Sequence, residues 1–185
     1  MKNIILLFIS ILSFCLASCA KHIPAQFEIV SMSLSNAQNT GESPSESTNN
    51  NVPKQAYAIK MILNEEMRKK TEGDAQENGF INEDKLVGLN IFSLYTFDAS
   101  HPANTSLNDY FLTSLSSSST ISNFISKGQI GGGSFKNGNY TDSWSTNQYL
   151  YLMTPPALPG PQSFVVKMDL SDGRSMCDTV NVTLY

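Results

Sequence analysis

The chain has 185 residues, with 12 Lys and Arg against 16 Asp and Glu and a formal charge of −4 at pH 7. A nucleic-acid binder needs a basic surface that displaces the counterions of the phosphates. This acidic balance therefore excludes nucleic acid as the expected partner.

The stretch 1–18 has the organisation of a bacterial lipoprotein signal peptide. Lys2 precedes a short apolar run over positions 4–12, and Leu16-Ala17-Ser18-Cys19 follows. The run falls well short of the roughly 20 apolar residues of a membrane-spanning helix. We therefore expect cleavage between Ser18 and Cys19, a lipid on Cys19 and a membrane tether over residues 19–25. The mature chain would be more acidic than the precursor, because Lys2 is the only charged residue that cleavage removes.

Strand signals then begin at Gln26 and continue to Leu34. The apolar alternation changes phase at Val30, which predicts a β-bulge within this strand. Residues 35–54 that follow are mainly Ser, Asn, Thr and Glu, with few aliphatic side chains. Such a segment lacks the apolar surface needed to order itself, so we expect a flexible polar loop.

Further strands are expected over residues 56–63, 86–97 and 147–153. In the first of these, Tyr57, Ile59, Met61 and Leu63 share one phase of the strand and should face the core, with Lys60 facing out. The charged segment between Glu65 and Gly79 suits either a solvated helical turn or a loop that connects strands. A short helix or strand fits residues 107–112, and the proline-rich connector 155–161 can join no β-ladder.

The C-terminal stretch from Phe164 to Leu184 predicts a β-hairpin around Ser171-Asp172-Gly173. A two-residue turn would set Met168 opposite Cys177 and place the apolar residues of the second strand on the wrong face. A three-residue loop with Gly173 in the left-handed conformation instead pairs Met168 with Met176 and Phe164 with Val180. We therefore predict the three-residue loop.

Short antiparallel strands, long polar connections and the absence of β-α-β alternation favour one fold class. We expect an all-β, immunoglobulin-like antiparallel β-sandwich with long polar loops, built as a single domain over residues 26–185. With Cys15 removed and Cys19 lipidated, Cys177 has no disulfide partner. The hydrophobic core must therefore hold the fold together.

Several motifs together resemble a family of uncharacterised β-rich Bacteroidetes outer-membrane lipoproteins. They are the lipobox at Cys19, Ala56-Tyr57-Ala58-Ile59, Leu94-Tyr95-Thr96-Phe97-Asp98, Asn108-Asp109-Tyr110-Phe111, and Phe164-Val165-Val166 with Asp172-Gly173. The resemblance spans most of the mature chain. It implies a β-rich fold and brings no catalytic residues with it.

The residues behind Cys19 bear on the destination of the chain. In known lipoproteins that this chain resembles, an Asp directly after the lipidated cysteine favours retention in the inner membrane, and an acidic cluster close behind the cysteine favours display on the cell surface. Here Ala20 follows Cys19, and no acidic cluster precedes Glu28. We expect a lipid-anchored protein of the bacterial outer membrane that faces the periplasm, with display on the cell surface as the alternative.

Catalytic and metal-binding patterns are sparse. A nucleophilic Cys177 would need a histidine beside it, and the candidates are His22 and His101. We expect Cys177 instead to pack as a small side chain within a strand. Two distant histidines and no carboxylate cluster at ligand spacing indicate no metal site, and no motif indicates a cofactor.

The aromatic residues of the glycine- and asparagine-rich region are the expected ligand-binding residues. Phe135, Tyr140 and Trp144 could stack on a sugar or anchor a protein partner, with Tyr149 and Tyr151 nearby in the sequence. The alternative is that these aromatic residues belong to the core.

Asp178-Thr179-Val180 matches the short O-glycosylation pattern of Bacteroidetes, which makes Thr179 a candidate for modification. Burial of Thr179 within a strand would prevent it.

These observations favour a non-enzymatic binding or scaffolding lipoprotein that contacts another envelope protein or a glycan. The alternative is an envelope hydrolase that uses Cys177 or an unrecognised carboxylate.

Overall fold

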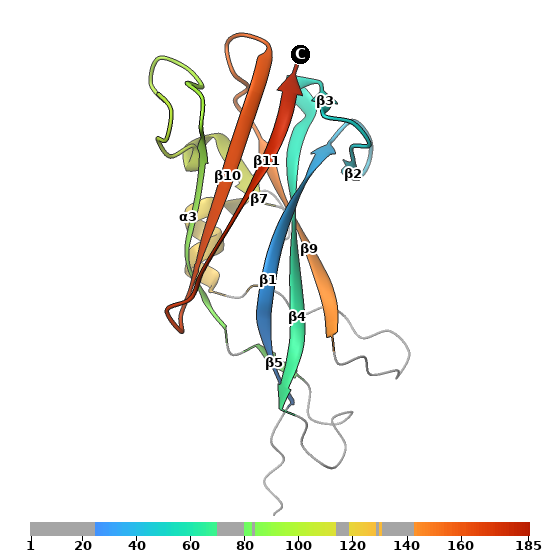
Figure 1. Ribbon diagram of the computed structural model, residues 1–185, viewed down its shortest axis with the longest axis vertical. Helices are drawn as coiled ribbons and strands as arrows, with labels where there is room; N and C mark the ends of the chain where they lie inside the picture. Colours follow the sequence, from blue (N-terminus) through green and yellow to red (C-terminus); the bar gives the residue numbers. More distant parts are fainter. Residues whose placement is uncertain (1–24, 70–79, 83, 114–118, 129, 131–142) are drawn as a thin grey trace, which may run out of the picture.

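Two β-sheets face each other in the computed structural model, which describes residues 25–69, 80–82, 84–113, 119–128, 130 and 143–185 (Figure 1). The elements of the first half are β1 (Ala25–Gln38), β2 (Ser45–Glu46), β3 (Asn51–Val52), η1 (Lys54–Ala56), β4 (Tyr57–Lys69), β5 (Phe80–Asn82) and β6 (Leu86–Ser93). Those of the second half are η2 (Asn108–Tyr110), β7 (Phe111–Thr113), β8 (Ser119–Thr120), α3 (Ile121–Lys127), β9 (Ser143–Leu152), β10 (Gly160–Leu170) and β11 (Ser175–Leu184).

The larger sheet has the strand order β2-β1-β4-β9-β7-β8, with β5 beside the start of β1, and the smaller sheet has the order β3-β11-β10-β6. Every long pair of neighbouring strands is antiparallel, and the short pairs β1–β5 and β11–β3 are parallel. The expected all-β sandwich is therefore confirmed.

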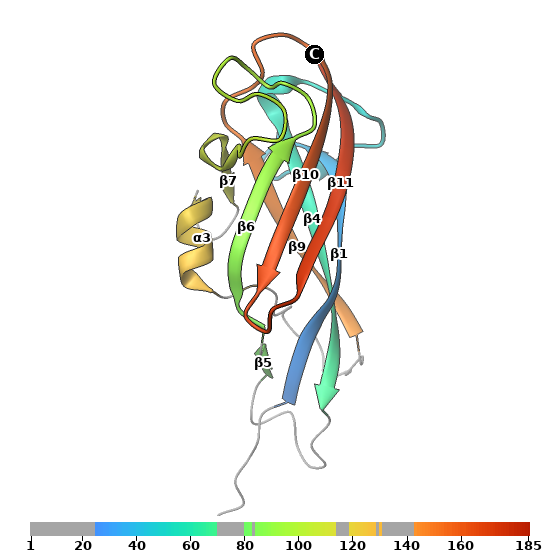
Figure 2. The same cartoon turned by 60° about the vertical axis from the view of Figure 1, so that its left-hand side comes forward.

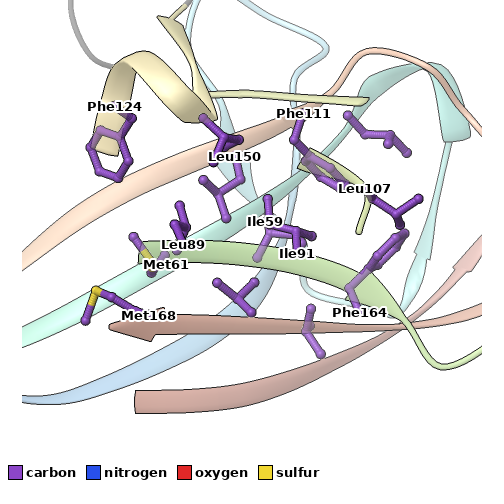
Figure 3. Close-up of a cluster of buried hydrophobic side chains, with 14 of the residues drawn as sticks. Ile59, Met61, Leu89, Ile91, Leu107, Phe111, Phe124, Leu150, Phe164 and Met168 are labelled. Carbon is purple, nitrogen blue, oxygen red and sulfur yellow. The ribbon is translucent and has the colours of Figure 1, made fainter. Parts of the chain in front are cut away.

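The core lies between the two sheets and follows the predicted alternation. Tyr57, Ile59, Met61 and Leu63 of β4 are all buried, as expected. They meet the buried side chains of β6, β10 and β11 from the opposite sheet, together with Phe124 of α3, which points toward the core (Figure 3). Phe164 of β10 is at the centre of an aromatic cluster and contacts the rings of Tyr57, Phe97 and Phe111 at centroid distances of 5.4, 6.1 and 5.8 Å.

The predicted bulge is present in β1. Ile29 pairs with Glu65 and Ser31 with Asn64, so Val30 is the additional residue and the register shifts around it. Ile29 before the bulge is fully buried, and Met32 and Leu34 after it pack against the same core. The bulge thus keeps both apolar phases of the strand on one face of the sheet.

The C-terminal hairpin has the predicted register. Met168 pairs with Met176 and Phe164 with Val180, and Gly173 has a φ of +90°. The Gly173 N–H donates to the carbonyl of Leu170 at 3.0 Å, which closes the three-residue loop. The inward face of β11 consequently carries Val180 and other apolar residues.

The expectation of a flexible loop over residues 35–54 is wrong for the parts of this range that form strands. β1 continues to Gln38, β2 pairs with the end of β1, and β3 pairs with the end of β11. The buried Asn36 side chain accepts from the hydroxyl of Tyr57 at 3.0 Å and donates to the carbonyl of Asn181 at 2.8 Å. Polar composition misled the prediction because these groups find hydrogen-bond partners on other strands.

Two further expectations need correction. Residues 65–69 continue β4 as a strand, because Glu65 pairs with Ile29 on one side and with Trp144 on the other. The remainder of the segment up to Gly79 lies outside the described residues. Residues 121–127 form the helix α3, which the sequence did not suggest: the side chain of Thr120 accepts from the N–H of Asn123 and caps α3, and Gly128 ends it with a φ of +63°.

The two ends of the sandwich differ. The first residue of β1 and the hairpin between β10 and β11 lie toward one end of the sandwich. The C-terminus lies at the other end (Figures 1 and 2). We call this second end the distal end. It carries the 94–107 loop after β6 and the 153–159 connector between β9 and β10, and these two segments lie side by side (Figure 2).

Candidate functional site

The structure does not show the predicted aromatic site as one cluster. Phe135 and Tyr140 lie outside the described residues. Trp144 occupies the second position of β9, opposite Glu65. Tyr149 and Tyr151 alternate with the buried Leu150, so they lie on the outer face of the larger sheet. Their rings are stacked there with centroids 6.3 Å apart.

Cys177 and Thr179 are both exposed on the outer face of β11. The expected packing of Cys177 is therefore wrong, because the hairpin register places Cys177 opposite the exposed Lys167 and turns it away from the core. Cys177 lies near the hairpin, whereas His101 lies in the 94–107 loop at the distal end. The structure therefore does not bring this thiol and this imidazole together. Exposure of Thr179 removes the steric objection to glycosylation, which stays a prediction.

A groove of about 430 Å³ opens at the distal end, and we call it the distal groove. It forms where β6 and β10 separate: the last register pair of their ladder is Phe164 with Ser93, and beyond it the N–H of Leu94 donates to the carbonyl of Ser163 at 2.9 Å. Its walls are residues 95–99 of the loop after β6, and residues 157–162 of the connector and the start of β10. Segments far apart in the sequence thus face each other across the groove.

Exposed apolar side chains are concentrated at the distal end, and two of them, Tyr95 and Leu158, line the distal groove. Among the described residues, seven large hydrophobic side chains are exposed, and five of them lie at the distal end: Leu94, Tyr95, Met153, Leu158 and Tyr185. Tyr95 is 52% exposed and Leu158 is 78% exposed. Single exposed hydrophobic residues are ordinary, whereas their concentration at one end makes the distal end the candidate site.

The wall formed by residues 95–99 is held by its own hydrogen bonds. Oδ1 of Asp98 accepts from the backbone N–H groups of Ser100 and His101, both at 2.8 Å. The N–H of Phe97 donates to the carbonyl of His101 at 3.0 Å, and the ring of Phe97 is buried in the core cluster. Backbone pairing and an aromatic anchor together position the exposed Tyr95.

Hydrogen bonds from Lys54 and Ser93 hold the opposite wall, which residues 157–162 form. Nζ of Lys54 donates to the carbonyls of Pro156 and Ala157, both at 3.3 Å. At the base of the groove, the hydroxyl of Ser93 donates to Oε1 of Gln162 at 2.8 Å, and both side chains are buried. These hydrogen bonds tie the connector to Lys54, and the start of β10 to the end of β6.

His101 lies between two carboxylates next to the distal groove. Its Nδ1 is 3.1 Å from Oδ1 of Asp98, its Nε2 is 3.4 Å from Oδ2 of Asp109, and its ring contacts that of Tyr110 at 4.3 Å. Desolvation opposes ionisation of Asp98, but hydrogen bonds from Tyr110 and His101 outweigh it and hold the pKa of Asp98 below its ordinary value. The hydrogen bond to Asp98 raises the pKa of Tyr110.

Comparison with known protein families matches residues 29–181 to a domain of unknown function, DUF5034. The chain belongs to this family. The matched range includes both sheets and both walls of the distal groove, and it begins after Cys19. No curated protein matches the chain significantly.

The described residues contain no helix of the length and hydrophobicity that a membrane span requires. Within the same residues, no three His, Cys, Asp or Glu side chains are grouped so that they could hold a metal ion.

Sequence reasoning missed the distal groove, although its parts are visible in the sequence. Leu94-Tyr95-Thr96-Phe97-Asp98 stands out as a motif, and the proline-rich connector is evidently unable to join a ladder. Nothing in the sequence places these two segments against each other, because only the pairing of β6 with β10 does so.

Proposed function

We propose that this chain is a non-enzymatic binding module, held at the bacterial outer membrane by a lipid on Cys19, that binds another envelope protein through its distal end. The anchor rests on Lys2, the short apolar run and Leu16-Ala17-Ser18-Cys19. The binding role rests on the distal groove.

The observation that carries the proposal is the concentration of exposed apolar side chains at the distal end, where Tyr95 and Leu158 line a groove whose walls are held by hydrogen bonds. Tyr and Met are enriched in the centres of protein interfaces, and Tyr95 and Met153 are both exposed at this end. A surface that is ordered before binding loses little conformational entropy on association, which favours affinity.

The position of the anchor supports the same role. Cys19 and Ala25 are close in the sequence, so a tether between them spans at most about 20 Å. β1 begins at Ala25, at the end opposite the distal groove (Figure 1). An anchored domain would therefore hold its base close to the membrane and present the groove away from it.

A binding role also agrees with the chemistry of the groove. Its one carboxylate, on Asp98, accepts hydrogen bonds from backbone N–H groups, His101 and Tyr110 and keeps a partly exposed negative charge in the wall. The exposed thiol of Cys177 lies away from the groove, near the hairpin. Catalysis requires an acid, a base and a nucleophile that converge on one point.

Site-specific photo-crosslinking in intact cells tests the proposal. A photo-reactive amino acid is placed at Leu158 or at Tyr95, and in the matched control at Val87, which is 56% exposed at the start of β6. We expect a discrete protein adduct from positions 158 and 95 and none from position 87. Equal labelling at all three positions, or adducts only at position 87, would contradict the proposal, and a carbohydrate adduct would assign the groove to a glycan.

A further inference from the structure

We propose that the distal groove recognises a basic and apolar segment of its protein partner, with an apolar side chain between Tyr95 and Leu158 and a cationic group beside Asp98. This inference rests on the proposed function and specifies the chemistry of the partner. It follows from the charge, the shape and the backbone of the groove.

The charge of the lining is one-sided. Of the eleven residues that line the groove, one is a carboxylate and none is Lys, Arg or His. The side chain of Asp98 remains 22% exposed, and Asp109, 62% exposed, contributes a second carboxylate on the far side of His101. Lys54, the cation behind the opposite wall, is directed to the carbonyls of Pro156 and Ala157. Charge complementarity therefore favours a cationic ligand group.

The apolar part of the lining surrounds this carboxylate. Tyr95 and Leu158 are exposed on opposite walls, and Phe97 below them is buried with its ring against the core. An apolar side chain that enters between the two walls would cover surface that water now contacts, and this burial favours binding. Burial of the apolar side chain contributes affinity, and the Asp98 carboxylate contributes selectivity for a cationic neighbour of that side chain.

The backbone argues against a ligand that adds a β-strand to the groove. The first residues of β10 pair with β11 on one side, and their other edge faces the groove without a partner in the β6 ladder. Pro161 lies on this edge and has no N–H, so the edge cannot continue a ladder. Recognition must therefore proceed through side chains, which makes the sequence of the partner segment decisive.

The test measures binding of short peptides to the folded domain by NMR titration. Four acetylated and amidated pentapeptides carry Leu-Lys, Leu-Gln, Leu-Glu or Ser-Lys at the centre. We expect Leu-Lys to bind most tightly and to shift the resonances of residues 95–99 and 157–162. Leu-Gln should bind about 2–5-fold more weakly, as expected for one partly exposed ion pair, and Leu-Glu more weakly still.

Two variants probe the carboxylate and one serves as the control. Asp98→Asn keeps the Oδ1 acceptor for Ser100 and His101 but removes the charge, so it should abolish the preference for Leu-Lys over Leu-Gln. Thr96→Lys adds a cation to an exposed position of the lining and should weaken Leu-Lys without altering the Asp98 hydrogen bonds. Asp169→Asn removes a surface carboxylate near the hairpin and should leave all four affinities unchanged.

Equal affinity for Leu-Lys and Leu-Glu would overturn the inference, as would shifts confined to residues outside the groove or the absence of binding by Leu-Lys. If any of these results accompanied protein crosslinks at position 158, the proposed function would stand and only the chemistry of the partner would be wrong. If Leu-Lys were preferred but no crosslinks formed in cells, the groove would have the inferred selectivity and the cellular role would fail.

Discussion

Arg174, directly after the hairpin turn, donates from Nη2 to Oδ2 of Asp84 at 2.8 Å, and Asp84 is buried just before β6. The same carboxylate oxygen accepts from the N–H of Ile29 at 2.8 Å, and Nη1 of Arg174 donates to the carbonyl of Ile29 at 2.6 Å. One ion pair thus connects two segments of the smaller sheet to the bulged strand of the larger sheet.

Arg174→Ala should destabilise the domain by roughly 2–3 kcal/mol, because it removes the guanidinium that compensates the buried carboxylate of Asp84. Urea unfolding at pH 7 measures the change. Lys167→Ala is the control, since its ion pair with Asp169 is exposed on both sides and should contribute under about 1 kcal/mol. Similar losses in the two variants would show that the contact with Asp84 carries no special weight.

Gly173→Val should destabilise the domain by about 1–2 kcal/mol, because the φ of +90° is unfavourable for a residue with a Cβ. Nothing lies within 4 Å of the position that this Cβ would take, so the cost is conformational and not steric. Gly41→Val, at an exposed glycine without a positive φ, should have little effect in the same urea melts. A Gly173 variant that melts like the wild type would refute the need for positive φ in this turn.

Val52→Ala should cost about 2 kcal/mol, because Val52 of β3 is fully buried against the core. Thr48→Ala, an exposed position in the same polar segment, should be nearly silent. Thermal and urea melts of both variants distinguish a structural segment from a dispensable one. Were both substitutions silent, the segment would behave as the loop that its composition suggests.

Asp98→Asn should lower the free energy of unfolding at neutral pH. The difference from the wild type should disappear in acid. Because the folded-state pKa of Asp98 lies below its ordinary value of 3.8, its ionised form stabilises the folded state above that value. This contribution is lost as the pH falls through the folded-state pKa. Urea unfolding of both proteins between pH 7 and pH 3 measures the difference, and a deficit that stays constant down to pH 3 would contradict the assignment.

Cys19→Ala should prevent lipidation and move the protein out of the membrane fraction or stop its processing, because the thioether requires the sulfur of Cys19. Cys15→Ala, earlier within the expected signal peptide, is the matched control and should leave fractionation unchanged. Fractionation followed by immunoblotting provides the readout. Membrane association of the Cys19 variant at the level of the wild type would exclude the lipid anchor.

The amino-acid sequence by itself determined the features that depend on neighbours along the chain. The inward residues of β4, the bulge at Val30 and the three-residue turn at Gly173 all follow from alternation with a period of two, which a one-residue slip would reverse. These local rules were sufficient for an all-β sandwich.

Only the tertiary structure decided which distant segments meet. The polar residues of 35–54 are ordered because Asn36 and β3 find partners on β11, and composition alone carries no information about such partners. The distal groove exists because β6 and β10 pair and then diverge, which sets Tyr95 and Asp98 opposite Leu158. Contacts between residues far apart in sequence depend on strand order, and strand order is settled by the packing of the whole core.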